Sequence, residues 1–163
     1  MTGDDRVAET TGDRGTYTLL LVRDTPGEIT AGALGAYHLP AGAYAYVGSA
    51  LGTGGFARVD RHRRVAAGDH DTRHWHVDYL TGDSATELAS VVTTGGVDAE
   101  CRIADGIDRR LSALTPKAAT APAVEPIADF GASDCDCRTH LFGHDSLGEL
   151  ETVVEEVHGT VRR

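Results

Sequence analysis

The sequence predicts a single α+β domain, in which a small antiparallel or mixed β-sheet is flanked by helices. Short β-prone runs separated by Gly and Pro turns occupy the first third of the chain, and longer segments with helical spacing of apolar residues follow them. The length of 163 residues normally supports one hydrophobic core.

The expected strands begin after a polar N-terminal segment. Residues 1–14 contain almost nothing apolar, which indicates a disordered acidic tail. A β-prone run from Tyr17 to Val22 is the first strand, ended by the turn sequence Asp24-Thr25-Pro26-Gly27. Because the next runs follow so closely, we expect an antiparallel meander. Its further strands are expected at 28–31, 34–39 and 43–49.

Helices are expected in three places. The first helix, 56–67, is closed by Gly68. The second keeps helical spacing from Val97 to Leu114 and ends before Pro116, and a strand is expected ahead of it at 88–93. An Ala/Pro-rich linker over 116–126 precedes the third helix, which runs from Asp145 to His158 with Asp145 or Ser146 as its cap. We therefore assign a domain over 15–142 and a C-terminal helix and tail over 143–163.

The composition is strongly acidic. Fifteen Lys and Arg stand against 25 Asp and Glu, for a formal charge of −10, and the cations comprise 14 Arg and one Lys. The chain has no Asn or Gln, a profile that resembles cytoplasmic proteins of halophiles, although an acidic protein of ordinary habitat would also fit. At first sight this charge argues against a nucleic-acid partner.

No apolar run approaches the roughly 20 residues of a membrane-spanning helix, and the first residues lack a signal peptide's apolar stretch. We therefore expect a cytoplasmic protein without a membrane partner.

The cations are concentrated on the first expected helix, which carries Arg58, Arg61, Arg63 and Arg64 together with His62. Against a background of −10, so dense a cluster would attract an anion such as phosphate, although a solvated basic face is the simpler interpretation. Arg58 and His62 are four positions apart and therefore project together.

Glu100 is unusual because its helical angle lies between those of Ile107 and Leu111, toward the core side. A buried carboxylate requires an Arg, hydrogen-bond donors or a metal ion. The alternatives are a buried Arg–Glu pair and an oxygen ligand for Mg²⁺ or Mn²⁺.

Cysteine and histidine suggest a second, structural metal site. Cys101, Cys135, Cys137 and His140 are zinc-ligand types, but a C-x-C pair followed by His is not the usual ligand hairpin. The alternative is that this turn packs against the helix of Glu100. An odd count of three cysteines argues against a disulfide framework.

A further segment concentrates His74, Trp75, His76 and Asp78 within five positions. These residues could bind a metal or stack on a base, or Trp75 and Tyr79 could simply anchor the segment to the core.

Several short strings together resemble the GIY-YIG nuclease superfamily, and within it the compact Uri-like branch. The core strings are Gly15-Thr16-Tyr17, Tyr46-Val47-Gly48-Ser49-Ala50, Gly55-Phe56-Ala57-Arg58 and Arg61-His62. The branch strings are His74-Trp75-His76-Val77-Asp78-Tyr79-Leu80, Glu100-Cys101, the run from Phe130 to Cys137, and His140-Leu141-Phe142.

The resemblance implies a role for each matching residue. Tyr17 and Tyr46 would line the site, one of them deprotonating or positioning the attacking water. Arg58 would steady the scissile phosphate and His62 would transfer a proton. Glu100 would bind a single Mg²⁺ or Mn²⁺ ion, and Tyr17 and Tyr46 could alternatively only pack within the sheet.

The resemblance also implies a function. We expect a metal-dependent endonuclease that hydrolyses DNA, with single-stranded or structurally irregular DNA favoured, in repair or in the removal of foreign DNA; RNA stays open as a substrate. Nucleic-acid contacts are expected from Ser49, Arg61, Arg64 and His76. The alternatives are a catalytically silent nucleic-acid-binding module and a zinc-dependent structural protein.

Two departures from the superfamily are visible. The two tyrosines lie 46 − 17 = 29 residues apart, which an extra hairpin between Asp24 and Pro40 would explain. The asparagine that many relatives place late in the domain has no counterpart, since the chain has no asparagine.

Overall fold

The protein has an α+β fold built on one four-stranded antiparallel sheet, of order β5-β1-β4-β6. The computed structural model describes residues 14–30, 36–51, 55–68, 80–83, 85–96, 98–114 and 140–162. The sheet strands are β1 (Gly15–Arg23), β4 (Gly42–Ala50), β5 (Thr86–Gly95) and β6 (Leu141–His144). The helices are α1 (Ala57–Ala66), α3 (Glu100–Leu114) and α4 (Leu147–Arg162).

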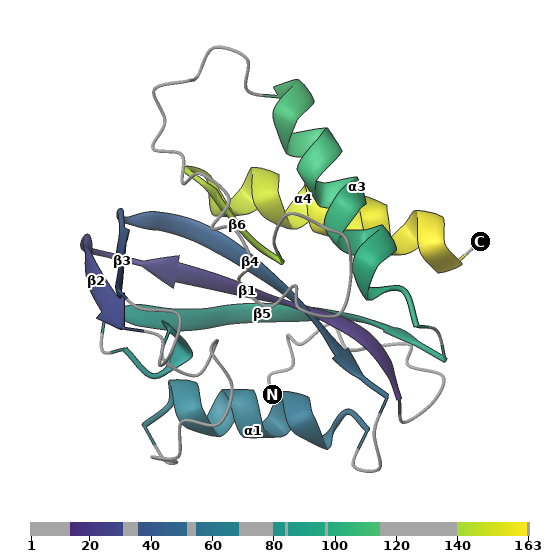
Figure 1. Ribbon diagram of the computed structural model, residues 1–163, viewed down its shortest axis with the longest axis horizontal. Coiled ribbons are helices and arrows are strands. Elements are labelled where there is room, and N and C mark those ends of the chain that lie inside the picture. Colours follow the sequence, from purple (N-terminus) through teal and green to yellow (C-terminus); the bar gives the residue numbers. More distant parts are fainter. Residues whose placement is uncertain are drawn as a thin grey trace.

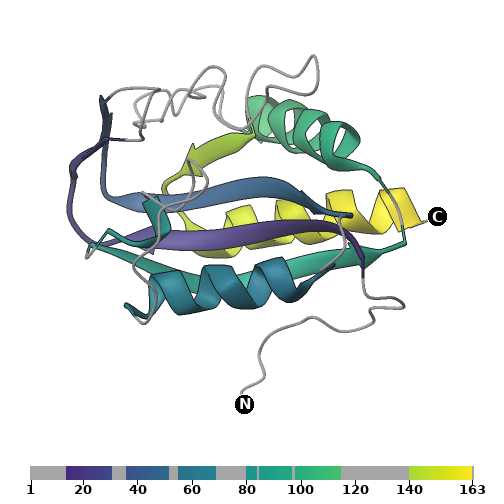
Figure 2. The same ribbon diagram turned by 60° about the horizontal axis from the view of Figure 1, so that its bottom comes forward.

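The layers are visible in Figure 1, where α1 covers one face of the sheet and α3 and α4 cover the other. Figure 2 shows the same arrangement from a second direction, with the central strands enclosed between the two helical layers. The α+β class expected from the sequence is thus confirmed.

The expected meander is wrong. Strand β1 pairs along its whole length with β4, and the short strands β2 (Gly27–Thr30) and β3 (Ala36–Leu39) form a separate two-stranded sheet. The reason is burial: β1 and β4 have nine residues each and are covered on both faces, whereas a four-residue strand offers too little apolar surface to replace either. The extra hairpin expected between Asp24 and Pro40 is confirmed.

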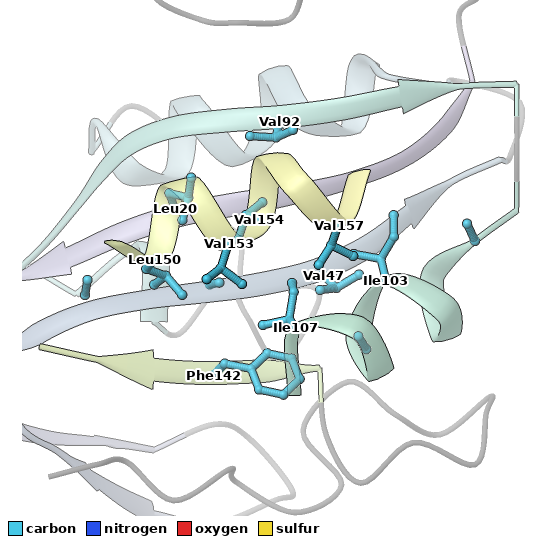
Figure 3. Packing of buried hydrophobic residues seen from close by; sticks show 14 residues of the cluster. Leu20, Val47, Val92, Ile103, Ile107, Phe142, Leu150, Val153, Val154 and Val157 are labelled. Atoms are coloured by element: carbon cyan, nitrogen blue, oxygen red, sulfur yellow. The ribbon is translucent and has the colours of Figure 1, made fainter. Parts of the chain in front are cut away.

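The sheet separates two hydrophobic cores. Alternate residues of β1 enter each: Leu19 and Leu21 face α1 and pack with Val59, while Leu20 faces the opposite side. Figure 3 shows that second core, where side chains of α3 and α4 meet those of the sheet and of Phe142 on β6. Burial of each large side chain contributes about 1.5–3 kcal/mol, so both faces fix the position of β1.

Helix ends follow the expected signals. Gly68 has φ +84° and its N–H donates to the Val65 carbonyl, so it closes α1 as predicted. Ser146 caps α4 by accepting from the Glu149 N–H at 3.2 Å, and the helix extends beyond its expected end at His158. Helix α3 begins at Glu100, later than the expected start at Val97, because the described residues Asp98 and Ala99 precede it without helical structure.

A buried histidine joins α4 to the sheet. His158, which is fully buried, lies 2.8 Å from the Thr18 hydroxyl through Nε2 and 2.8 Å from the Thr94 hydroxyl through Nδ1. The two threonines lie on β1 and β5, so one side chain links three elements and satisfies the polar groups that α4 covers.

Other expectations fall outside the described part of the chain: the tail up to residue 13, the linker over 116–126, and the segment with His74, Trp75, His76 and Asp78. No helix of the described residues is long and apolar enough to span a membrane.

Candidate functional site

Three successive residues of β4, Val47, Gly48 and Ser49, each contact one part of a polar cluster. Strand β6 pairs with β4 only from Ala43 to Tyr46. Among the strands that the structure describes, none pairs with β4 beyond Tyr46 on this side. The cluster therefore forms where β4 leaves its neighbour, and we call Val47–Gly48–Ser49 the β4 edge.

Gly48 leaves the space that the Tyr17 ring occupies. The two residues are direct partners in the β1–β4 ladder. A Cβ atom on residue 48 would lie 2.5 Å from both Cζ and Oη of Tyr17, far inside van der Waals contact. The glycine of the second motif is therefore required by the tyrosine of the first.

The Tyr17 hydroxyl meets a histidine from α1. Its Oη lies 2.8 Å from His62 Nε2, and the two rings contact each other with centroids 5.4 Å apart. A neutral imidazole nitrogen facing a phenol can accept its proton, so this pair has the composition of a proton-transfer couple. Helical spacing predicted that His62 lies beside Arg58. In the structure the His62 ring also contacts Tyr17.

Arg58 reaches the same strand from α1. Its Nη1 donates to the Ser49 carbonyl at 2.8 Å. This bond fixes the guanidinium, a group suited to binding anions, at the β4 edge. Arg58 and Ser49 are both partly exposed, which is the exposure an anion-binding group needs.

Glu100 approaches from the other face of the sheet. Its Oε2 lies 2.9 Å from His140 Nδ1, and the His140 carbonyl accepts from the Val47 N–H at 2.9 Å. The side chain of Glu100 is 21 % exposed and that of His140 is 1 % exposed. The carboxylate thus has a partner, as expected, but that partner is a histidine rather than the buried Arg considered from the sequence.

The first turn of α3 is fastened to β1. The Thr16 hydroxyl accepts from the Ala99 N–H at 3.0 Å, and Thr16 pairs directly with Ser49 in the ladder. The residue before Glu100 is therefore bonded to the strand position opposite the Arg58 contact. Sequence analysis assigned no contact to Thr16 and missed this cap; a polar residue opening an apolar strand was its only signal.

The cluster has a buried and an accessible part. Tyr17 and His62 are 2 % and 1 % exposed, whereas Arg58, Ser49 and Glu100 are partly exposed. The surface of the site is therefore a guanidinium and a carboxylate, with the phenol–imidazole pair behind them.

Of the remaining expected site residues, some lie near this cluster and one lies outside the residues that the structure describes. Tyr46 is half-buried against the core that contains Tyr17, on the same face of the sheet. On α1, Arg61 is half-buried and Arg64 is exposed. His76 lies outside the described residues.

The donor set of Glu100 fits Mg²⁺ or Mn²⁺. One oxygen faces His140, which leaves lone pairs of a partly exposed carboxylate for a cation. Mg²⁺ commonly uses one or two carboxylates and completes its shell with water and phosphate oxygens. Within the described ranges no group of three or more His, Cys, Asp or Glu is arranged to bind a metal, so a site here would depend on such outside ligands.

The expectation against a disulfide is wrong, because Cys101 is disulfide-bonded. The odd cysteine count was a poor guide, since it leaves one thiol over without preventing the other two from pairing. A disulfide sulfur is not the thiolate that zinc binds, which removes Cys101 from the possible zinc ligands in this state. Cys135 and Cys137 lie outside the described residues.

Fold and site together define a small α+β domain with a polar cluster at the β4 edge. A family model described as "Domain of unknown function DUF123" matches residues 16–163. The chain therefore belongs to this family. Neither the curated proteins nor the solved structures contain a match to it.

Proposed function

We propose that the protein is a GIY-YIG-type endonuclease that hydrolyses phosphodiester bonds in DNA. The observation that carries this proposal is the convergence of a phenol–imidazole pair, a guanidinium and a carboxylate on the β4 edge. Phosphodiester hydrolysis needs these groups: a proton acceptor for water, a cation facing the phosphoryl oxygens, and a ligand for a Lewis-acidic ion.

We assign proton transfer to Tyr17 and His62. The attacking water gives a proton to the Tyr17 oxygen as the phenol proton passes to His62 Nε2, and the new bond from water oxygen to phosphorus replaces the bond to the leaving oxygen. The 2.8 Å contact suits this relay. Tyr46, half-buried on the same face, lines the side from which DNA approaches.

Arg58 is assigned to the scissile phosphate, because a partly exposed guanidinium held at the β4 edge matches the geometry of phosphoryl oxygens. Glu100 would hold a divalent ion, which would supply Lewis acidity to the phosphoryl group. Arg61, Arg64 and Ser49 contact the neighbouring backbone. Single-stranded or irregular DNA is the favoured substrate, because nothing among the described residues resembles a module that reads regular duplex.

The test is a cleavage assay with labelled single-stranded and duplex DNA, Mg²⁺ or Mn²⁺, and high KCl. We expect cleavage by the native protein and a loss of at least 100-fold in Arg58→Ala and Glu100→Ala. Arg109→Ala is the matched control, since that exposed arginine lies on α3 and pairs with Asp105. No cleavage by the native protein, or unchanged cleavage by the two site variants, would contradict the proposal.

The burial of Tyr17 and His62 favours one alternative, a nucleic-acid-binding module in which the pair only packs. Tyr17→Phe separates the two functions, because it removes one hydroxyl and keeps the ring. An endonuclease loses about 10²-fold or more in cleavage rate, whereas a silent module binds DNA as before and forms no product.

A further inference from the structure

We infer that Thr16 is a positioning residue, whose hydroxyl holds the start of α3 and so keeps the Glu100 carboxylate in place relative to the Arg58 guanidinium. This inference rests on the proposed function only in taking Glu100 as a metal ligand and Arg58 as a phosphate contact. Three observations carry it: the hydrogen bond from Ala99 to Thr16, the burial of Thr16 between two paired strands, and a second bond that ties the same connection to β1.

The direction of the hydrogen bond is fixed by its donor. A backbone N–H only donates, so the Ala99 N–H donates to Thr16 Oγ1 at 3.0 Å. The Ala99 carbonyl accepts from the Ile103 N–H at 2.8 Å, in the first turn of α3. The first N–H groups of a helix have no partner within the helix, and the Thr16 hydroxyl supplies one from β1. Because Ala99 is buried, loss of this hydroxyl would leave its N–H without the acceptor.

Thr16 is itself held firmly in the sheet. It is fully buried on β1, where it pairs with Ser49 of β4 on one side and with Thr94 of β5 on the other. The Ser49 carbonyl accepts the hydrogen bond from Arg58. The helix that carries Glu100 and the strand residue that holds Arg58 therefore meet at Thr16.

The connection from β5 to α3 is tied to β1 at a second point. The Gly96 N–H donates to the Arg14 carbonyl at 2.7 Å, and Gly96 has φ +78°, which turns the chain away from β5. Since β1 begins where β4 and β5 end, α1 and α3 both start at this end of the sheet (Figure 1). Together the two bonds hold the start of α3 against the first residues of β1.

A second threonine on β1 provides a matched comparison. Thr18 lies two positions further on, faces the same side of the sheet and is also fully buried. Its hydroxyl lies 2.8 Å from His158 Nε2, so its contact leads to α4 instead of α3. Thr18→Val and Thr16→Val therefore each remove one buried hydroxyl contact, but only Thr16→Val releases the helix of Glu100.

The first experiment locates Mn²⁺ on the full chain without DNA, by paramagnetic broadening of amide signals. Bound Mn²⁺ should broaden the Glu100 and Ser49 amides of the native protein, and the ratio of the two effects reports the position of the ion. We expect Thr16→Val to change this ratio about 3-fold or more, Thr16→Ser to restore it, and Thr18→Val to leave it unchanged. The inference is overturned by an unchanged ratio in Thr16→Val, by a serine variant that behaves like the valine variant, by an equal change in Thr18→Val, or by no broadening at Glu100 in the native protein.

The second experiment is a single-turnover cleavage assay with Mn²⁺ at saturating single-stranded DNA. We expect Thr16→Val to cleave about 10- to 100-fold more slowly with unchanged affinity for DNA, and Thr16→Ser to cleave at nearly the native rate. A native rate in Thr16→Val, where the native protein cleaves, would overturn the inference. A Thr16-dependent broadening ratio in a protein that cleaves no DNA would contradict the proposed function alone.

Hydrogen exchange of the native protein covers the case in which Thr16→Val does not fold. The Ala99 amide should exchange about 100-fold or more slowly than the amide of Asp98, the exposed residue before it. Equal exchange rates would overturn the inference, because the Thr16 hydroxyl would then not hold the start of α3.

Discussion

Gly48 is the residue on which the geometry of the site depends most closely. The Tyr17 ring occupies the space beside Gly48, and any residue other than glycine would place a Cβ atom in that space. The same requirement links the two sequence motifs physically, since one supplies the ring and the other the missing Cβ. The geometry of the site therefore depends on the register between β1 and β4, in which Tyr17 and Gly48 are direct partners.

Gly48→Ala should therefore displace the Tyr17 ring and break its bond to His62. We expect a loss of about 1–3 kcal/mol in the free energy of unfolding, as for other overpacked sites, and a matching loss of cleavage. Denaturant unfolding of Gly48→Ala in the Tyr17→Ala background is the control, because the clashing atoms are then absent. An equal cost in both backgrounds would show that the ring is not what Gly48 accommodates.

Tyr44 gives a prediction for alkaline pH. Burial raises the pKa of its phenol to about 12, partly offset by the positive charge of Arg23. A raised pKa of an acid favours the neutral form in the folded state, so this contribution to stability is complete below pH 10 and is lost as pH rises to 12. The slope over this interval is at most about 1.4 kcal/mol per pH unit.

The check is unfolding free energy against pH for the native protein and Tyr44→Phe. The variant should lose about 1 kcal/mol at pH 7, because the hydroxyl donates to the Pro40 carbonyl, and should decline less steeply between pH 10 and 12. Parallel curves above pH 10 would exclude Tyr44 as the source.

At the scale of elements, the site depends on how α3 packs, since its first turn carries Glu100. Helix α3 approaches α4 closely at Gly106, where an added Cβ would lie 2.9 Å from a Val157 methyl group. Both helices also bury their apolar faces on the same side of the sheet (Figure 3). The glycine therefore sets the separation of the two helices.

Gly106→Ala should separate the helices and destabilise the protein by about 1–3 kcal/mol. Gly159→Ala on α4 should instead stabilise it by about 0.5–1 kcal/mol, because no atom lies within 4 Å of the added Cβ and alanine favours helix. Thermal unfolding of the two variants tests this. A stabilising Gly106→Ala would contradict the close approach.

Local patterns in the sequence predicted the elements but not all of their pairings. The apolar run of β1 and the helical spacing of α3 are readable because each depends on neighbours in the chain. Pairing of β1 with β4 instead of β2 depends on which strands can bury both faces. The partner of Glu100 was equally long-range, because His140 lies 40 residues away and meets it only through the β6 register.

At the scale of the whole molecule, the charge of −10 and the proposed DNA partner are compatible if binding is local. Arg64 is exposed on α1, the helix beside the β4 edge, while Arg109 is exposed on the opposite helical layer. The two arginines differ in position far more than in exposure. They can therefore distinguish a local phosphate contact from a general effect of charge.

Arg64→Ala should weaken binding of single-stranded DNA and reduce the slope of log affinity against log salt by about 0.7, the value for one phosphate contact. Arg109→Ala should change neither quantity. Fluorescence anisotropy over a range of KCl concentrations measures both variants. Equal effects would mean that net charge, not the α1 surface, governs binding.

The proposed mechanism requires groups from both helical layers to form one catalytic unit at the β4 edge. Tyr17 belongs to the α1 face and Glu100 to α3, so a double-mutant cycle joins the two sides. The measurement is the single-turnover rate of single-stranded DNA cleavage with Mn²⁺ for Tyr17→Phe, Glu100→Gln and the double variant. We predict losses of at least 100-fold for each single variant and hardly more for the double variant, as for residues that act as a unit. Losses that multiply, or a Tyr17→Phe variant with the native rate, would contradict the claim.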